Sequence, residues 1–588
     1  MMHYRVRIDP RARQLELDVE LERAAAGDLV LHVPTWVPGA YAFMKYGRDV
    51  FDVRAEDAAT GASLVVRREG MSGLAIDGAP RSLVVRARVT ASDPAWGELV
   101  GVIFESGAIV RATHFPFDPA HQGPCRVSVT APPGWAIHPP SGARAVGDDT
   151  YELPSFAALV DSPIAVGTFE HRTRTLRGVT FHHVFMGRAV GFEREVEHFL
   201  DQVMAVSAAT ADVFGGVFPF AEYTYVYATD PRASWGLESA HSTLVGIGDG
   251  VFIDDEERRA AIRLVAHELF HAWNVCRLRP RALMQPDLVQ GSFPDGLWIS
   301  EGITRYYELL LATRVGALSA ARMLSNLVRY DRALRALPAT RHTTLVDSSL
   351  ATFLNHNRYP GAASATIDYY DKGMVVAFAI DACLRTAARP SSLDDAFRAF
   401  YEAFHARGFG TSDAIAFFDE YAAPLGPIEP LGALLERCVR GAEMPDIVAW
   451  LARLGVTSAR AEVPHLGMWL ARDRGPAIVD VVEGSPAAEA GLGAGDEIVG
   501  QAGYAFRPDA LAWLVRHEAS FDVEIQSGHV RRTATVRPSP HSIVSELSLP
   551  DRGAGLVSWL GPGAADLLAG AHVVPGHYDN FHARESML

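Results

Sequence analysis

The chain has 588 residues, of which 48 % are hydrophobic and 21 % charged, so it is long enough for several domains and too apolar to be mostly disordered. Its net charge of −16 argues against general nucleic-acid binding. No run reaches the roughly 18 apolar residues of a membrane-spanning helix, so we expect no membrane insertion. Four scattered cysteines without a C-x-x-C pair, and a start that leads directly into strand-like sequence, favour a reduced, cytoplasmic location.

Changes of sequence pattern divide the chain into four predicted regions. Residues 1–167 alternate apolar and polar side chains between Gly and Pro turns, for example over 83–89, which predicts an antiparallel β-sandwich-like domain. Residues 168–445 change to helical periodicity and predict a mainly helical domain with a short strand region near its start; its expected helices include 193–214, 319–335 and 371–387. Residues 446–540 return to short strands with two short helices, and residues 541–588 are a predicted appendage. The expected fold class is therefore multidomain α+β.

The centre of the chain carries the motif H-E-x-x-H, from His267 to His271. Residues i and i+4 lie on one face of a helix, so both imidazoles can reach one metal ion. Glu268, next to the first ligand, can reach a water on that metal. Acidic residues from Asp254 onward support a helix over 254–274, because the helix dipole favours acids in a first turn. The alternative is a partly buried histidine pair beside a surface glutamate.

A catalytic zinc needs a third protein ligand and an open position for water. Glu301 stands among apolar residues at the start of a predicted helix over 297–316, where an isolated carboxylate is costly unless it is paired or binds a metal. A second helix can therefore deliver Glu301 as the third ligand of one Zn²⁺ per chain. The alternative is an acid that only stabilises the helix start through the dipole.

These segments resemble the glycyl aminopeptidase family of zinc metallopeptidases, whose members carry a PDZ domain. Residues 267–280 look like the family's zinc helix, residues 297–307 look like its third-ligand helix, and residues 33–41 (Val-Pro-Thr-Trp-Val-Pro-Gly-Ala-Tyr) resemble its all-β domain. The resemblance implies a thermolysin-like catalytic domain of the gluzincin class, here residues 168–445.

The resemblance also implies an oxyanion donor. Residues 368–373 (Asp-Tyr-Tyr-Asp-Lys-Gly) look like the Tyr-x-Lys-Gly element of gluzincin aminopeptidases, whose tyrosine donates a hydrogen bond to the developing oxyanion. Tyr370 matches that tyrosine by position, and Tyr369 is the second choice. Lys372 is one of only two lysines in this arginine-rich chain. The alternative is a tyrosine pair packed at a helix start.

A further segment resembles the family's Gly-Gly-Leu-Glu-His stretch, with Trp235 and Ser239 as departures from it. The resemblance implies that Gly236 and Glu238 bind the substrate and that Glu238 holds its free α-amino group by a charge-assisted hydrogen bond. A solvated acid in a loop is the alternative.

Residues 481–499 have a PDZ-like pattern of strand, turn, short helix and Gly-Asp turn into a strand. Residues 466–469 resemble the loop that receives a peptide carboxylate, and residues 509–517 are the expected groove helix. Such domains bind extended peptides or protein C-termini by strand addition. A structural PDZ-like domain that braces the catalytic domain is an equally good interpretation.

We therefore predict a zinc-dependent aminopeptidase that hydrolyses small or apolar amino-terminal residues from peptides with a metal-activated water. Glu268 is the predicted proton shuttle and Tyr370 the predicted oxyanion donor. The alternatives are a zinc endopeptidase recruited through its PDZ-like domain and a catalytically silent peptide-binding scaffold. Peptides are the expected partners, nucleic acids and membranes are not, and an oligomer is compatible with the sequence.

Overall fold

The computed structural model describes residues 1–44, 46–91, 101–187, 192–229, 235–355, 362–471, 476–549, 554–561, 564, 572–573 and 585–587. The chain folds as two compact units: Met1–Phe293 with His405–Gly408, and Pro294–Phe404 with Phe409–Leu588. Among the described helices, none has both the length and the apolar character needed to cross a bilayer.

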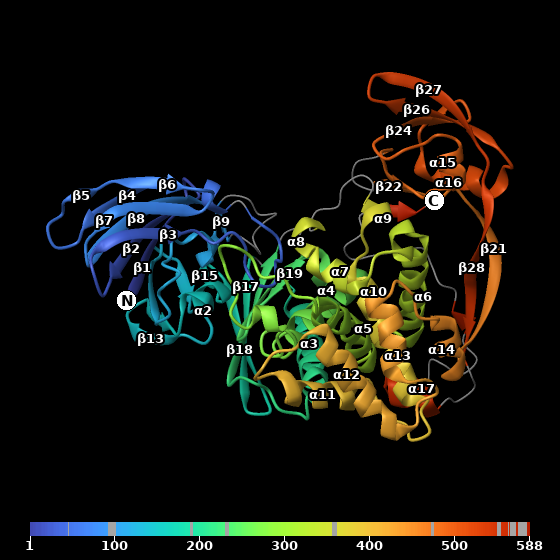
Figure 1. The fold of residues 1–588 in the computed structure, drawn as a ribbon, viewed down its shortest axis with the longest axis horizontal. Helices are drawn as coiled ribbons and strands as arrows, with labels where there is room; N and C mark the ends of the chain where they lie inside the picture. The colour runs from blue at the N-terminus through green and yellow to red at the C-terminus, as the bar shows by residue number, and fades with distance from the viewer. Residues whose placement is uncertain are drawn as a thin grey trace. The chain divides into compact units, whose positions relative to one another are not determined.

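The amino-terminal part of the first unit consists of β-sheets (Figure 1, blue). Its strands alternate as the sequence predicts: every second residue of β2, from Leu15 to Leu21, is buried. The buried faces share one apolar core. The largest sheet has the order β13 (Arg144–Gly147), β14 (Thr150–Leu153), β11 (Cys125–Thr130), β1 (Met2–Asp9), β2 (Gln14–Glu22), β8 (Ser82–Thr90), β4 (Val50–Asp57) and β5 (Ser63–Leu64).

Two smaller sheets complete this β-rich region, which confirms the predicted β domain at the amino terminus. One has the order β3 (Gly27–His32), β7 (Gly73–Ala79) and β6 (Val66–Glu69); the other has the order β12 (Ala136–His138), β15 (Ile164–Gly167), β10 (Gly107–Val110) and β9 (Val102–Phe104). The short helix α2 (Phe156–Asp161) is capped by the Ser155 side chain, which accepts a hydrogen bond from the Ala158 amide.

A five-stranded mixed sheet and two helices form the rest of the first unit. The strand order is β16 (Glu170–Leu176), β17 (Val179–Met186), β18 (Glu222–Thr229), β20 (Ser242–Ile247) and β19 (Trp235–Glu238). Helix α3 (Glu193–Val213) contacts β16 and α4 (Asp255–Phe270), and α4 also contacts β19 and β20. The helix that carries H-E-x-x-H therefore lies against the edge strand β19.

The second unit begins with a mainly helical block, as predicted for the middle of the chain. Helix α10 is its centre, because nearly every side chain from Asp371 to Leu384 is buried by surrounding helices. The helices are η6 (Trp298–Ile303), α5 (Thr304–Arg314), α6 (Ala320–Ala336), α7 (Leu345–Leu350), α8 (Thr352–Asn355), α9 (Ala362–Ala365), α10 (Tyr369–Arg385), α11 (Leu393–Phe404), α12 (Thr411–Ala422), α13 (Leu431–Leu435), η9 (Glu436–Arg440) and α14 (Ile447–Arg453).

Short strands and helices follow, around a separate apolar core. They are β21 (Thr457–His465), β22 (Met468–Ala471), β23 (Ile478–Val481), α15 (Pro486–Glu489), β24 (Glu497–Gln501), β25 (Tyr504–Ala505), α16 (Pro508–His517), β26 (Phe521–Ser527) and β27 (Val530–Val536). The sheets have the orders β25-β24-β26-β27, β23-β22-β30 and β21-β28-β29. The predicted domain limits remain predictions.

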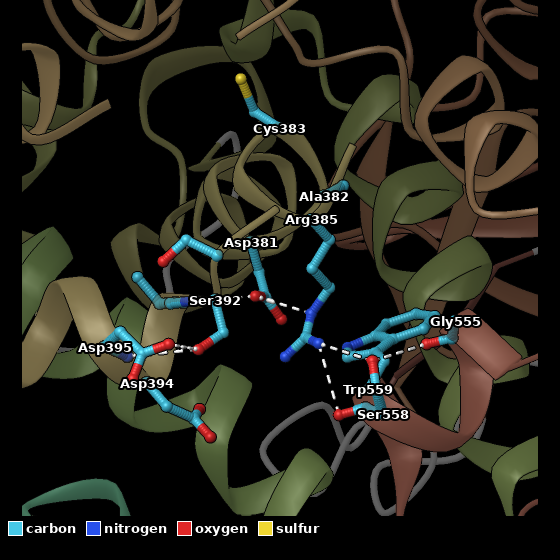
Figure 2. A network of polar contacts seen from close by, with 12 residues as sticks. Asp381, Ala382, Cys383, Arg385, Ser392, Asp394, Asp395, Gly555, Ser558 and Trp559 are labelled. Atoms are coloured by element: carbon cyan, nitrogen blue, oxygen red, sulfur yellow. Dashed lines mark hydrogen bonds and ion pairs between the residues drawn. The ribbon is translucent and has the colours of Figure 1, made fainter. Parts of the chain in front are cut away.

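The carboxyl-terminal residues contribute β28 (Ser539–Ser548), α17 (Ala554–Leu560), β29 (His572–Val573) and β30 (Glu585–Met587). Helix α17 is attached to the helical block by polar contacts, shown in Figure 2, in which Arg385 lies between Asp381 and Ser558. Arg385 pairs with Asp381 at 2.9 Å and donates to the Ser558 carbonyl at 3.3 Å. Trp559 is fully buried and donates to the Tyr306 hydroxyl at 2.7 Å.

Candidate active site

Helix α4 presents the two histidines of the H-E-x-x-H motif on one face, as predicted. Its start is fixed by Asp254, whose carboxylate accepts hydrogen bonds from the amides of Glu256 (2.8 Å) and Glu257 (2.9 Å). The ring centroids of His267 and His271 lie 4.6 Å apart and the rings are almost perpendicular. Regular α-helix ends at Phe270, earlier than the predicted residue 274, because the amides of Ala272 and Trp273 bond to carbonyls three residues back and tighten the chain.

The tautomer of His271 follows from its surroundings. Its Nδ1 lies 2.6 Å from the carbonyl oxygen of Asn274, which can only accept a hydrogen bond. Nδ1 therefore carries the proton, and Nε2 keeps the lone pair that can bind a metal. A backbone carbonyl that orients a histidine in this way is typical of metal sites.

Two groups of buried side chains around this motif could hold a metal ion. One consists of His267, His271 and Glu301, which are the three predicted ligands; the other consists of Glu238, Glu268 and His271. Within each group the ligand atoms lie within 4.8 Å of one another. The predicted proton shuttle Glu268 and the predicted amine-binding Glu238 are therefore near neighbours.

Gly236 lets β19 pass directly over Glu268. A β-carbon at position 236 would lie 2.2 Å from the Glu268 Oε1 atom, so no larger residue fits without displacing that carboxylate. Side chains alternate along a strand, so Gly236 and Glu238 share the face toward α4. Trp235, which departs from the family pattern, points to the opposite face, where its ring covers Gly246 of β20.

Glu238 is buried, and two other parts of the first unit lie beside it. It is paired with Thr243 of β20, whose hydroxyl donates to the Leu237 carbonyl at 3.1 Å. Gly39, at φ +90°, lies so close that a β-carbon there would come within 2.9 Å of both Glu238 carboxylate oxygens. The amino-terminal β domain thus contributes a loop to this end of the site.

Arg277 lies nine residues after Glu268, in the segment that follows α4. It donates to the carbonyls of Ala240 (3.0 Å) and Ala272 (2.6 Å). A third hydrogen bond reaches the Pro219 carbonyl at 3.0 Å. Arg277 therefore joins the segment after α4 to the segment after β19.

In the second unit, Glu301 lies in the π-helical turn η6, a local geometry found frequently at functional sites. This turn crosses α10 with almost no space between the backbones. A β-carbon on Gly302 would lie 2.4 Å from the Gly373 Cα atom, and one on Gly373 would lie 2.8 Å from the Gly302 Cα atom. The two glycines bring the segment of Glu301 next to the segment of the two tyrosines.

The predicted tyrosines occupy the first turn of α10, which begins at Tyr369 rather than at the predicted residue 371. Asp368 caps the helix by accepting a hydrogen bond from the Tyr370 amide at 2.7 Å. The Tyr369 hydroxyl lies 3.0 Å from the Thr352 hydroxyl, and burial together with the nearby Glu301 charge raises the pKa of Tyr369. The Tyr369 and Tyr370 rings are stacked with their centroids 4.9 Å apart, and the oxyanion role of Tyr370, with Tyr369 as the second choice, stays a prediction.

Buried charged side chains surround the first turn of α10. Arg305 of α5 pairs with Asp371 at 3.0 Å, and both side chains are almost completely buried. Arg305 also donates to the Tyr330 hydroxyl at 3.0 Å. Lys372 is fully buried, and desolvation lowers its pKa to about 8.

Residues 260–376 match the family described as M61 glycyl aminopeptidase, and residues 3–168 match the peptidase M61 N-terminal domain. These matches confirm membership of the glycyl aminopeptidase family. The chain is thus a peptidase, and M61 peptidases are generally metallopeptidases, in agreement with the His and Glu groups around α4. No curated protein matches the chain.

The fold of this M61 peptidase is also similar to a solved structure, an aminopeptidase N family protein from Idiomarina loihiensis. The TM-score is 0.84 at 19 % sequence identity, and the match covers 96 % of this chain and 100 % of the other. This likeness concerns the fold alone.

Two residues near the site had no role in the sequence-based prediction of this M61 peptidase. Gly39 belongs to the 33–41 motif, but nothing in that motif indicates that its loop reaches Glu238. Arg277 belongs to the family-like stretch after H-E-x-x-H, but its three carbonyl partners lie far apart in the sequence. Both depend on tertiary packing, for which a single sequence carries no local signal.

Proposed function

We propose that this M61 peptidase is a zinc-dependent aminopeptidase that removes small or apolar amino-terminal residues from peptides. The observation that carries the proposal is the group of Glu238, Glu268 and His271, because it puts a second buried carboxylate beside H-E-x-x-H. Two close carboxylates destabilise each other's ionised form unless positive charge lies near them. A metal ion at the histidines and a substrate α-ammonium at Glu238 are cations that these carboxylates attract.

The donor set of His267, His271 and Glu301 fits Zn²⁺. Two imidazole nitrogens and one carboxylate are the protein ligands of one of the main types of catalytic zinc site. The hydrogen bond from His271 Nδ1 to the Asn274 carbonyl supports binding through Nε2. When bound there, Zn²⁺ supplies Lewis acidity and lowers the pKa of a coordinated water to about 7.

Glu268 has the chemistry of the proton shuttle. It lies one residue after His267 on α4 and is not needed as a ligand in the His267, His271 and Glu301 set. Its carboxylate takes the proton of the attacking water and passes it to the leaving amine. Gly236 supports this role, because a side chain at that position would overlap with the Glu268 carboxylate.

Tyr370 has the chemistry of the oxyanion donor. Its hydroxyl donates a hydrogen bond to the oxygen that gains charge as water attacks, and this contact is stronger in the transition state than with the substrate. The buried Arg305–Asp371 pair and the Gly302–Gly373 crossing support the role because they fix the turn that carries Tyr370.

Glu238 sets how far a peptide enters the site. A buried carboxylate that accepts hydrogen bonds from an α-ammonium favours substrates with a free amino terminus over internal peptide bonds. Gly39 lies close to this carboxylate, and Arg277 bonds to the Ala240 carbonyl just after the strand that carries it. The endopeptidase alternative requires that Glu238 contributes nothing to binding.

Peptide binding by residues 466–536 is a second proposed function, which rests on strand β22. Residues 585–587 of the chain pair with β22 as an antiparallel strand, in register from Trp469↔Met587 to Ala471↔Glu585. Strand addition to such an edge is how PDZ domains bind extended peptides. Removal of residues 582–588 should therefore increase the affinity of a synthetic peptide with that sequence. Equal affinity for the truncated and full chains would favour a structural role.

Zinc analysis of purified variants tests the metal centre. His271→Ala should lose about one zinc per chain and all activity, whereas Glu268→Gln should keep its zinc and lose roughly 10²- to 10⁴-fold in turnover. The exposed His198 of α3 gives a matched control, because His198→Ala should change neither property. Full zinc retention by His271→Ala would contradict the assignment.

A further inference from the structure

Three histidines from three different strands come together in the first unit, outside the candidate active site. His138 ends β12, His171 lies in β16, and His182 lies in β17. Their ligand nitrogens all lie within 4.8 Å of one another. The ring centroid of His138 lies 5.1 Å from that of His171 and 5.5 Å from that of His182.

Strand register explains the meeting of two of these rings. His171 is paired with Val184 and His182 with Thr173, so the two histidines are diagonal neighbours on one face of the β16–β17 pair. Alternation sends Glu170 and Arg172 to the opposite face, where Arg172 pairs with Glu193 of α3 at 2.6 Å. The histidine face is thus separated from that charged network.

The nitrogen atoms have positions suited to a metal ion. His138 Nδ1 lies 3.2 Å from the Pro139 carbonyl, to which it donates, so Nε2 keeps its lone pair. His171 Nε2 lies 3.0 Å from His182 Nδ1. Two tetrahedral zinc ligands with Zn–N bonds of about 2.0–2.1 Å lie about 3.3 Å apart, so these two nitrogens need to move only slightly.

The cluster lies where two sheets meet. An apolar cluster joins Ile109 and Ala165 of the four-stranded sheet to Val184 and Val226 of the five-stranded sheet. His138 belongs to the first of these sheets, and His171 and His182 belong to the second. A metal ion bound by all three histidines would therefore connect the two sheets.

We propose that His138, His171 and His182 form a second metal site that binds a divalent transition-metal ion, Zn²⁺ above all. Three imidazoles select zinc, copper or nickel over Mg²⁺ and Ca²⁺, which prefer oxygen ligands. His138 is buried and His171 is exposed, so the fourth position of a tetrahedral ion faces solvent and takes a water. The site is structural, and the peptidase reaction does not use it.

Metal content measured on the full chain tests this proposal. After removal of metal with a chelator, the protein is loaded with Zn²⁺, dialysed and analysed for zinc, with Mg²⁺ loading as a parallel control. His171→Ala/His182→Ala should hold about one zinc per chain fewer than the wild type. It should keep its peptidase activity, and its melting temperature should rise less with added Zn²⁺ than that of the wild type, because only the active-site zinc is left. His198→Ala, an exposed histidine on α3, should behave as the wild type.

The two metal sites are distinguished by combining variants. His267→Ala/His271→Ala should still bind the zinc of the three-histidine site, and this zinc should be lost when His171→Ala/His182→Ala is added. Equal zinc content in His171→Ala/His182→Ala and the wild type would overturn the proposal. A loss of zinc as large in His198→Ala would also overturn it, because it would mean unspecific binding to surface histidines. Neither result depends on whether the active-site assignment is correct.

Discussion

Gly236 and Glu268 lie so close that a β-carbon on Gly236 would be 2.2 Å from the Glu268 Oε1 atom. The first residue belongs to the edge strand β19 and the second to the helix of the H-E-x-x-H motif. The helix that carries Glu268 therefore packs directly against the strand that carries Glu238. The proposed proton shuttle and the proposed amine-binding residue lie side by side.

Gly236→Ala should displace the Glu268 carboxylate and lower kcat by roughly 10²-fold, because a shift of about 1 Å at a reacting group can cost that much. Zinc content should not change, since neither residue belongs to the His267, His271 and Glu301 set. Steady-state kinetics and zinc analysis check this. Gly147→Ala is the control, because a β-carbon there meets only ordinary contacts at 3.6 Å or more. Wild-type kcat in Gly236→Ala would mean that Glu268 is not the shuttle.

Tyr370→Phe should lower kcat by about 10²- to 10³-fold with little change in KM, because the hydrogen bond to the oxyanion forms late in the reaction. Tyr369→Phe is the comparison variant: its hydroxyl lies 3.0 Å from Thr352, so its loss should mainly affect local packing. The two variants are compared on the same aminoacyl arylamide. A larger loss of kcat for Tyr369→Phe would assign the oxyanion role to Tyr369.

Trp559→Ala should lower the free energy of unfolding of the second unit by about 3–5 kcal/mol, since it removes a fully buried aromatic ring. The variant also removes the hydrogen bond from Trp559 to the Tyr306 hydroxyl. Urea unfolding followed by circular dichroism measures the effect. Trp513→Ala serves as the control, because Trp513 is 49 % exposed. Similar stability of the two variants would show that α17 is not an integral part of the unit.

Much of the fold could be predicted from hydrophobic periodicity. The helices expected over 193–214 and 319–335 are found as α3 and α6 with limits that differ by one residue. The strand expected over 83–89 is found as β8, one residue longer at each end. Such long, regular segments bury one face, and the sequence pattern reports that burial directly.

The features that could not be predicted depend on contacts between distant segments. The π-helical turn at Glu301 has no compositional signature, because its hydrogen bonds differ from those of an α-helix only in spacing. The loop at Gly39 reaches Glu238 across almost two hundred residues of sequence. The three-histidine cluster likewise combines three strands, and none of its residues stands in a motif.

The central claim is that Glu238 makes this peptidase an aminopeptidase, and paired peptides with free and acetylated amino termini test it most directly. A charge-assisted hydrogen bond contributes roughly 1.5–3 kcal/mol, so Glu238→Ala should lower kcat/KM for the free peptide by about 10- to 1000-fold. Zinc content should stay unchanged, and the exposed Glu222 of β18 provides the control variant Glu222→Ala. The account predicts that the wild type cleaves the free peptide and barely cleaves the acetylated one. Equal cleavage of both peptides by the wild type, or no loss in Glu238→Ala, would contradict it.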